Sequence, residues 1–223
     1  MTKPLSLLLL FLCSLTCLHA QEFFEGEVQY TISYEAINKN LSANILEREL
    51  GSTMTAYVKE DRYTMITHIS GQQGWIKVII RLDEGFSYTE YEKSDTIIKS
   101  KLNKPPGTLI NLSSITENKK MVLGEACEAI SLNYTPAEHI PFVKEIKGTY
   151  YFNPKYRLNA KWYTEQTEGF WNLYVQESKS LSLRNEVEYS PLFKSIQEAT
   201  SVAEKDMDHQ LFEPNADKII SIE

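Results

Sequence analysis

The chain has 223 residues, a length that suits one large β domain. It carries 30 Asp and Glu against 23 Lys and Arg, which gives a net charge of −7, and its basic residues do not cluster into a stripe. This charge balance argues against nucleic acid and anionic lipid surfaces as partners.

The first twenty residues have the pattern of an export signal. Lys3 precedes an apolar run over residues 5–18, and Ala20 supplies a small residue at the end of the run. The pattern predicts a signal peptide over residues 1–20, cleaved near Ala20, and a single domain over residues 21–223 in the periplasm or outside the cell. No later run is long enough to cross a bilayer, so we expect a soluble protein that is not transmembrane.

Two cysteines inside the apolar run raise the alternative of lipoprotein anchoring. Cys13 follows Phe11-Leu12 and Cys17 follows Leu15-Thr16, and neither pair offers the small residue normally found before an acylated cysteine. Cleavage near Ala20 is therefore favoured. It would leave Cys127 as the one cysteine of the exported chain, without a partner for an intramolecular disulfide.

Period-two alternation dominates the first half of the remaining chain. Residues 22–35 form the clearest strand, with Val28, Tyr30, Ile32 and Tyr34 on one face. Residues 36–50 break the alternation and predict a helix, either lying across an open cavity or packed between two strands. Hairpins follow over residues 53–59 with 62–69 and over residues 75–82 with 86–91, and we expect the second hairpin to lie at the centre of an antiparallel sheet.

The second half continues in short strands. Residues 96–102 end at a Lys-Pro-Pro-Gly stretch, residues 104–107, which cannot continue a ladder. Further strands are predicted over 114–121, 126–134, 147–153, 160–164, 181–189 and 195–204. Residues 135–142 read as a loop, residues 166–178 are ambiguous between helix and strand, and residues 211–214 are expected to end the fold.

These elements favour a mainly β fold. About ten or more antiparallel strands with one or two helices indicate a strongly curved sheet or barrel rather than a helical bundle. If helices do not fill the interior, a cavity remains.

Four short stretches resemble an exported family of unknown function from Gram-negative bacteria. They are residues 24–30 (FEGEVQY), 55–62 (TAYVKEDR), 122–127 (VLGEAC) and 211–214 (LFEP). The family is thought to share the fold of LolA, the outer-membrane lipoprotein carrier, so the resemblance implies an open β-barrel with helices over its mouth. It also implies a turn at Gly124 entering a strand and a closing edge near Phe212 and Pro214. None of these motifs is catalytic, and fold alone does not assign function.

Catalytic and metal-binding patterns are weak in this sequence. Cys127 lies in an alternating strand, where a small buried thiol is the ordinary interpretation. A nucleophile would need a histidine brought near by folding, and His68, His139 and His209 are available outside the leader. Asp206, Asp208 and His209 form one compact cluster, which reads better as a solvated acidic loop than as a metal site. We therefore predict no catalytic residue, no metal and no cofactor.

The aromatic side chains remain as candidates for binding. Eight of them project from predicted strands and could line a cavity, although for any single residue core packing is the favoured interpretation: Tyr30, Tyr34, Tyr63, Tyr88, Tyr150, Phe152, Trp162 and Tyr189. The leading hypothesis is a non-enzymatic carrier of a lipid, acyl chain or other hydrophobic ligand. The alternatives are an envelope module that docks another protein and, less favoured, an exported hydrolase.

Overall fold

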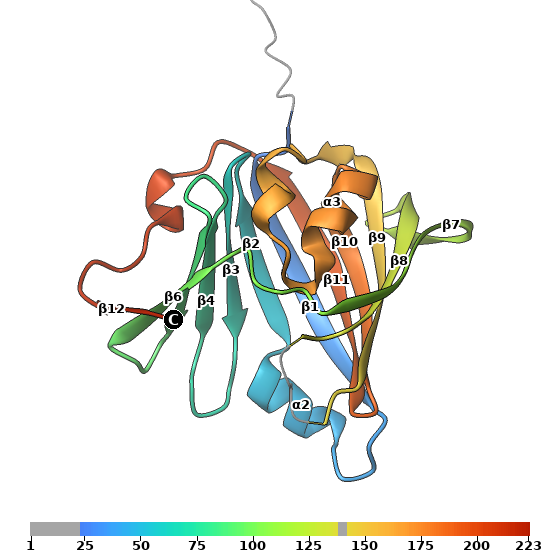
Figure 1. Ribbon diagram of the computed structural model, residues 1–223, viewed down its shortest axis with the longest axis horizontal. Helices are drawn as coiled ribbons and strands as arrows, with labels where there is room; N and C mark the ends of the chain where they lie inside the picture. Colours follow the sequence, from blue (N-terminus) through green and yellow to red (C-terminus); the bar gives the residue numbers. More distant parts are fainter. Residues whose placement is uncertain (1–22, 138–141) are drawn as a thin grey trace, which may run out of the picture.

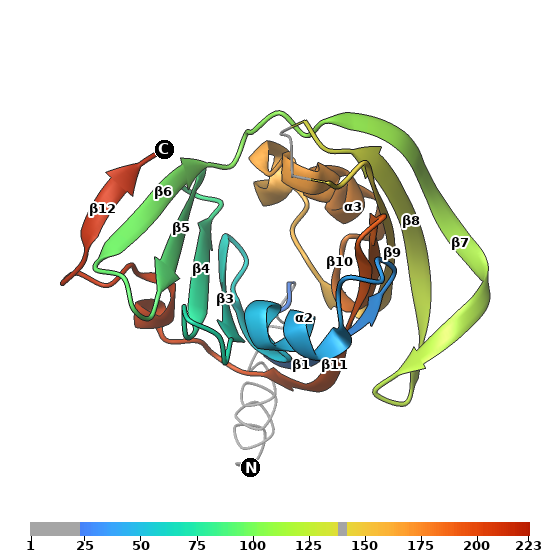
Figure 2. The same cartoon turned by 90° about the horizontal axis from the view of Figure 1, so that it is seen from below.

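A computed structural model describes residues 23–137 and 142–223, and the predicted signal peptide lies outside them. The described chain forms one twelve-stranded, strongly curved sheet (Figures 1 and 2). Its strands are β1 (Gly26–Ala36), β2 (Thr53–Val58), β3 (Arg62–His68), β4 (Ile76–Arg81), β5 (Phe86–Tyr91), β6 (Thr96–Lys101), β7 (Thr108–Val122), β8 (Glu125–Thr135), β9 (Glu145–Arg157), β10 (Ser180–Ser190), β11 (Phe193–Glu204) and β12 (Ile219–Ile222).

The sheet is open. The strand order is β12-β6-β5-β4-β3-β2-β1-β11-β10-β9-β8-β7, so β12 and β7 are its two edges. Neighbouring strands pair antiparallel except β12, which lies parallel to β6. Residues 102–107 connect β6 near one edge to β7 at the other, and this crossing segment spans the gap in the cylinder (Figure 2). The predicted open, mainly β fold is confirmed.

Helical segments cover the concave face and one end of the sheet. Three of them, η1 (Trp162–Glu165), η2 (Glu168–Phe170) and α3 (Trp171–Ser178), lie inside the curve against β8, β9 and β10 (Figure 2). Helix α2 (Ala43–Leu50) lies at one end of the sheet (Figure 1) and begins after Ser42, whose side chain accepts a hydrogen bond from the Ile45 N–H.

Alternating side chains divide the packing between two faces. Val28, Tyr30 and Tyr34 of β1 are buried on the concave side, and they share one face of the strand as the sequence predicts. On the convex side, Ile79 and Tyr88 belong to a second buried cluster with Ile97, Met207 and Phe212. The C-terminal segment, residues 205–218, covers that cluster and includes the short helix η3 (His209–Phe212).

Hydrogen bonds between side chains and backbone fix this C-terminal segment to the outer face of β3 to β5. The Thr64 hydroxyl donates to the Leu211 carbonyl at 3.0 Å, and the Lys77 ammonium donates to the Glu213 carbonyl at 3.0 Å. Buried Glu90 accepts from the Asn215 N–H at 3.0 Å. Because of these contacts the outer face of the β3 to β5 wing is part of the core and not a solvated surface.

Several sequence-based expectations about individual elements were wrong. The hairpin of β4 and β5 is not at the centre of the sheet but near its β12 edge. Strand β1, which pairs with β11, occupies the middle. Residues 160–164 are not a strand: the Lys161 N–H bonds the Asn159 side chain at 3.2 Å and starts the turn that becomes η1. The fold also continues past residue 214 to β12.

The turns of two hairpins lie where the sequence predicts them, although β7 begins at Thr108 and the predicted strand began at residue 114. The turn between β4 and β5 contains Gly85 at φ 74°, the positive value expected there. The turn between β7 and β8 uses Leu123 at φ 53° and Gly124 at φ 79°. The ambiguous residues 166–178 are helical from residue 168 onward.

Candidate ligand cavity

Helix α3 packs against the concave face at β8 and β10. Trp171 and Tyr174 stack with ring centroids 4.6 Å apart, and both rings pack against Tyr150, at 5.7 and 5.3 Å. Phe152 lies edge-on to Tyr174 at 6.4 Å. This aromatic plug occupies the β8 to β10 side of the concave face.

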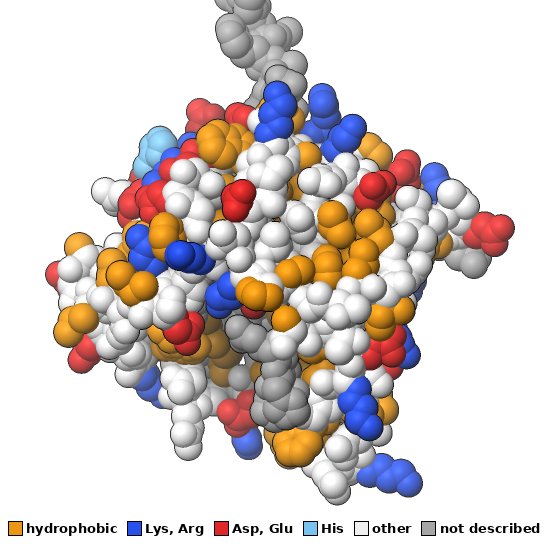
Figure 3. Space-filling view, viewed as in Figure 1, with side chains coloured by type: hydrophobic (Ala, Val, Ile, Leu, Met, Phe, Trp, Pro, Cys, Tyr) orange, Lys and Arg blue, Asp and Glu red, His pale blue; other side chains and the backbone are white. Residues whose placement is uncertain are grey.

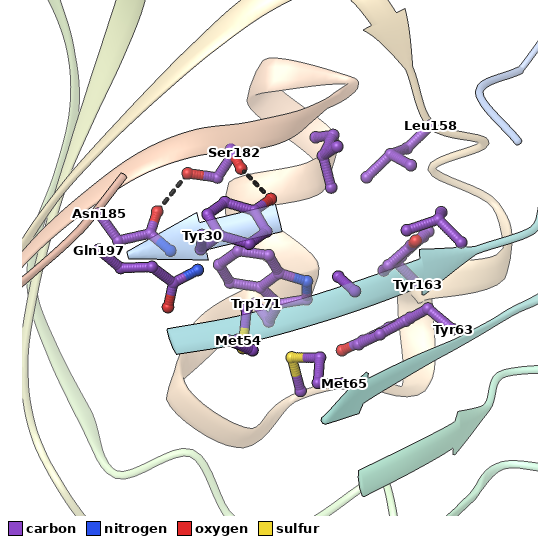
Figure 4. A pocket seen from close by; sticks show the side chains of 13 residues that line it. Tyr30, Met54, Tyr63, Met65, Leu158, Tyr163, Trp171, Ser182, Asn185 and Gln197 are labelled. Carbon is purple, nitrogen blue, oxygen red and sulfur yellow. Dashed lines mark hydrogen bonds between the residues drawn. The ribbon is translucent and has the colours of Figure 1, made fainter. Parts of the chain in front are cut away.

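An apolar cavity, here called the inner cavity, lies between the plug and strands β2 and β3. It has a volume of about 250 Å³ (Figure 4). It is lined by Tyr30, Met54, Ala56, Val58, Tyr63, Met65, Leu158, Tyr163, Trp171, Leu181, Ser182, Asn185 and Gln197.

A second cavity of about 550 Å³ continues along the concave face toward α2. It is lined by Ile32, Tyr34, Leu50, Val143, Tyr150, Asn185, Val187, Tyr189, Leu192, Phe193, Ser195 and Gln197. Asn185 and Gln197 line both spaces, so the two cavities adjoin at this pair of amides. Ligand pockets of known proteins span about 300 to 1,000 Å³, a range that the adjoining cavities reach.

The walls of both cavities are electrically neutral. None of the described residues that line them is Asp, Glu, Lys, Arg or His. Burial raises the pKa of the Tyr34 phenol to about 12, with smaller contributions from Tyr189 and Glu47, and it raises the pKa of Tyr30, Tyr63 and Tyr150 further. These phenols therefore stay protonated at physiological pH and present apolar rings with few polar atoms.

Two of the phenol groups are held in place by hydrogen bonds to backbone. The Tyr30 hydroxyl donates to the Ser182 carbonyl at 2.9 Å, and the Tyr34 hydroxyl donates to the Gly51 carbonyl at 2.9 Å. The amide of Gln166, in the turn before α3, donates to the Tyr63 hydroxyl. These hydrogen bonds hold the aromatic rings of the cavity walls in place, in addition to their apolar packing.

A third, more polar space lies on the wing formed by β4 to β6. Its volume is about 350 Å³, and its lining includes Lys104, Glu168 and Glu223 among aliphatic and hydroxyl side chains. Hydrophobic side chains are visible across the middle of the face shown in Figure 3, with many of the charged side chains toward its border. The two adjoining cavities therefore have a more apolar lining than this third space.

The structure distributes the eight predicted aromatic residues over several environments. Tyr30 and Tyr63 line the inner cavity, and Tyr34, Tyr150 and Tyr189 line the second. The other three lie elsewhere: Phe152 packs under α3, Tyr88 lies in the convex cluster, and Trp162 is 38% exposed in η1.

The alternation of side chains along β5 explains why Tyr88 lies outside the cavities. Ser87 and Thr89 of β5 border the space on the concave side, so Tyr88 between them points to the convex side. Trp162 lies outside the cavities because residues 162–165 form η1 and not the predicted strand. Its indole N–H donates to a carboxylate oxygen of Glu60 at 3.4 Å.

Sequence reasoning missed several residues of the inner cavity. Met54 and Met65 lie in the hairpin predicted over residues 53–59 and 62–69, and its alternating pattern could have identified them as candidates. Asn185 also carried a signal, because it is a polar residue at a position where Leu183 and Val187 set an apolar phase. Gln197 and Trp171 had no comparable local signal.

Cys127, the candidate nucleophile, has the properties of a structural residue. Cys127 is fully buried, its thiol approaches the Glu125 carbonyl at 3.8 Å, and burial raises the pKa of the thiol, which opposes thiolate formation. His68 and His209 are exposed, and His139 lies outside the described residues.

The acidic cluster near the C-terminus has a structural role as well. Asp208 caps η3 by accepting a hydrogen bond from the Gln210 N–H at 3.0 Å. Within the described ranges, no group of three or more His, Cys, Asp and Glu side chains is placed to hold a metal ion.

In the described residues, no helix combines the length and the apolar character needed to cross a bilayer. No family model matches the chain, and no curated protein matches it.

Solved structures do show similarity over most of the chain. An uncharacterized conserved protein from Thermus thermophilus has a TM-score of 0.47 and 9% identity, covering 89% of this chain and 91% of that one. A LolA superfamily protein from Nitrosomonas europaea has a TM-score of 0.40 and 8% identity, covering 86% and 91%. The lipoprotein LppX from Mycobacterium tuberculosis has a TM-score of 0.38 and 9% identity, covering 82% and 89%.

Proposed function

We propose that this protein is a non-enzymatic binding protein of the periplasm that holds a hydrophobic ligand, such as a lipid or an acyl chain, against its concave face. The observation that carries the proposal is the pair of adjoining cavities with walls of Tyr, Met and aliphatic side chains and no charged lining residue among those described.

The energetics of an apolar cavity favour this function. Protein interiors are normally close-packed, and an apolar void costs the contacts that its walls would otherwise make. An apolar guest restores those contacts and removes its own surface from water, which is worth about 0.8 kcal/mol per buried methylene. A ligand with a long hydrocarbon part gains most from such a site.

Filling the inner cavity tests the proposal. Ala56 of β2 is buried and lines the inner cavity, whereas Ala126 of β8 is exposed. We expect the exported chain to bind a fluorescent amphiphile, and Ala56→Phe to weaken that binding at least about tenfold because the added ring occupies the same space. Ala126→Phe is the matched control and should bind as the original chain does.

Two results would overturn the proposal. One is the absence of binding to any amphiphile in displacement titrations and native mass spectrometry. The other is equal binding by Ala56→Phe and Ala126→Phe, once circular dichroism shows both folded.

The proposed location rests on residues 1–20. Expression in a Gram-negative host followed by fractionation should place the protein in the periplasmic fraction, and intact-mass measurement should show a chain beginning at Gln21. An acylated mass with membrane recovery would instead favour anchoring at Cys13 or Cys17.

A further inference from the structure

Two amides face each other in the middle of the concave face. Asn185 of β10 and Gln197 of β11 are directly opposed across the antiparallel ladder. The same row of the sheet continues to Ile32 on one side and Tyr150 on the other. The amide pair is therefore a polar island between apolar residues, at the junction of the two cavities.

The hydrogen bonds of Asn185 leave a donor available. The Ser182 hydroxyl donates to the side-chain carbonyl oxygen of Asn185, so this oxygen already accepts one hydrogen bond. The Asn185 amino group makes no hydrogen bond to a residue that the structure describes. Figure 4 shows this amide beside Gln197, with Tyr30 and Trp171 next to them.

The side-chain amide of Gln197 also has hydrogen-bonding groups without a partner among the described residues. Within residues 23–137 and 142–223, its side chain makes no protein hydrogen bond, and both ends of the amide are free for a guest or for water. Since half-buried amides lose much of their hydration when an apolar chain enters, a guest that supplies a hydrogen-bonding group recovers this loss.

The charged residues that flank the amide pair on these two strands lie on the opposite face. Arg184 and Lys194 both bond Glu186 at 2.9 Å, and Arg184 also pairs with Glu198. Their alternation with Asn185 and Gln197 places them on the convex side, where they neutralise one another. No cation among the described residues lines the cavities to receive an anionic group.

We propose that Asn185 and Gln197 form a subsite for an uncharged hydrogen-bonding group of the ligand, such as an ester, a carboxamide or a hydroxyl. The subsite selects neutral amphiphiles over anionic amphiphiles of the same chain length. This inference rests on the proposed binding function and names the chemistry of the ligand at one position.

The selectivity has a direct physical cause. A neutral ester or amide carbonyl accepts from either side-chain amino group and loses little hydration on entry. An ionised carboxylate or phosphate loses much stronger hydration in the same apolar surroundings, and two neutral amides do not replace it.

The experiment uses three ligands that share a twelve-carbon chain: dodecanoate, dodecanamide and monododecanoylglycerol. Displacement titrations at pH 8 keep the acid ionised. We expect dodecanamide and monododecanoylglycerol to bind the exported chain at least about tenfold more tightly than dodecanoate.

Substitutions locate the preference. Asn185→Leu and Gln197→Leu should each reduce the preference for the neutral ligands severalfold, while Gln29→Leu, on the exposed side of β1, should leave it unchanged. Gln197→Lys adds a cation at the subsite and should shift the preference toward dodecanoate. Far-ultraviolet circular dichroism checks that each variant is folded.

The outcomes separate this inference from the general function. Equal affinity for the three ligands, or an unchanged preference in both Gln197 variants, overturns the amide subsite while the binding function stands. Failure of all three ligands, together with failure of unrelated amphiphiles, overturns the binding function and the subsite with it.

Discussion

Tyr30 shows how a polar atom is accommodated in the wall of an apolar cavity. Its ring lines the inner cavity while its hydroxyl donates to the Ser182 carbonyl at 2.9 Å. Tyr30→Phe removes this hydrogen bond and leaves the ring in place. We expect a loss of about 1 kcal/mol in the free energy of unfolding, measured by urea denaturation.

Tyr57→Phe is the control for Tyr30→Phe. Tyr57 also lies in the sheet, on β2, but its hydroxyl bonds no residue that the structure describes, so its removal should change stability little. Equal stability of the two variants would contradict the role assigned to the Tyr30 hydroxyl.

Glu186 gives the protein a pH-dependent contribution to stability. Burial by itself raises the pKa of the carboxyl, but hydrogen bonds from Lys120, Lys194 and Arg184 outweigh burial and lower it to about 2. Because the folded pKa is below the unfolded value, this stabilisation is present above about pH 4.5 and is lost as the pH falls toward 2.

Glu186→Gln should therefore reduce stability mainly at neutral pH. We expect a deficit of about 1 kcal/mol at pH 7 after allowance for solvent screening, shrinking as the pH falls below 4. Urea titrations at pH 7 and pH 3 measure it. Glu128→Gln, at an exposed position of β8, should show no such trend, and a deficit for Glu186→Gln that is the same at both pH values would refute the assignment.

At the residue scale, the sequence identifies the faces of long strands better than it identifies a site. Alternation in β1 correctly placed Tyr30 and Tyr34 on the face that encloses the cavities. The alternation in β5 could not show that Tyr88 lies on the convex face, since the apolar side of β5 is the one that the C-terminal segment covers. Which face of such a strand is concave depends on strands far away in the chain.

At the scale of elements, the C-terminal segment closes the convex core. Phe212 of η3 is fully buried in the cluster with Ile79, Tyr88, Ile97 and Met207. Phe212→Ala leaves a cavity under the segment, and we expect it to cost about 3 to 5 kcal/mol of the free energy of unfolding.

Phe142→Ala is the matched change at a surface position, because Phe142 is 77% exposed. It should leave the urea midpoint nearly unchanged. If the two variants unfold at the same denaturant concentration, the C-terminal segment is not part of the cooperative core.

The errors over individual elements have local physical causes. Residues 160–164 contain aromatic residues of high strand propensity, but a backbone hydrogen bond to the Asn159 side chain and a bend to the interior override that preference. The short β12 was missed because an edge strand of four residues depends on pairing with β6, and none of its residues is buried.

At the scale of the whole molecule, the open cylinder depends on contacts between distant parts of the chain. Strand β1 pairs with β11 from Gly26 opposite Glu204 to Ala36 opposite Phe193. Local periodicity indicates that such strands exist and that the sheet is large, but it does not give their order. The fold class was therefore predictable, whereas the position of the cavities beside α3 was not.

The crossing segment, residues 102–107, is tied to the interior at Thr167. The Thr167 hydroxyl donates to the Lys104 carbonyl, and its backbone N–H bonds the Leu102 carbonyl at 3.3 Å. These are contacts between the start of η2 and the connection that bridges the two ends of the sheet. Thr167→Val removes the hydroxyl and keeps the side-chain shape.

We expect Thr167→Val to loosen the crossing segment without unfolding the sheet. Loss of one hydrogen bond of about 1 kcal/mol should raise amide hydrogen exchange near residues 102–110 about fivefold, with the exchange of β9 and β10 unchanged. Thr164→Val, which removes an exposed hydroxyl bonded to Lys161, is the control and should leave the exchange near residues 102–110 unaltered. Identical exchange in both variants would show that Thr167 does not restrain the connection, whereas faster exchange throughout the sheet would mean that the crossing segment supports the whole cylinder.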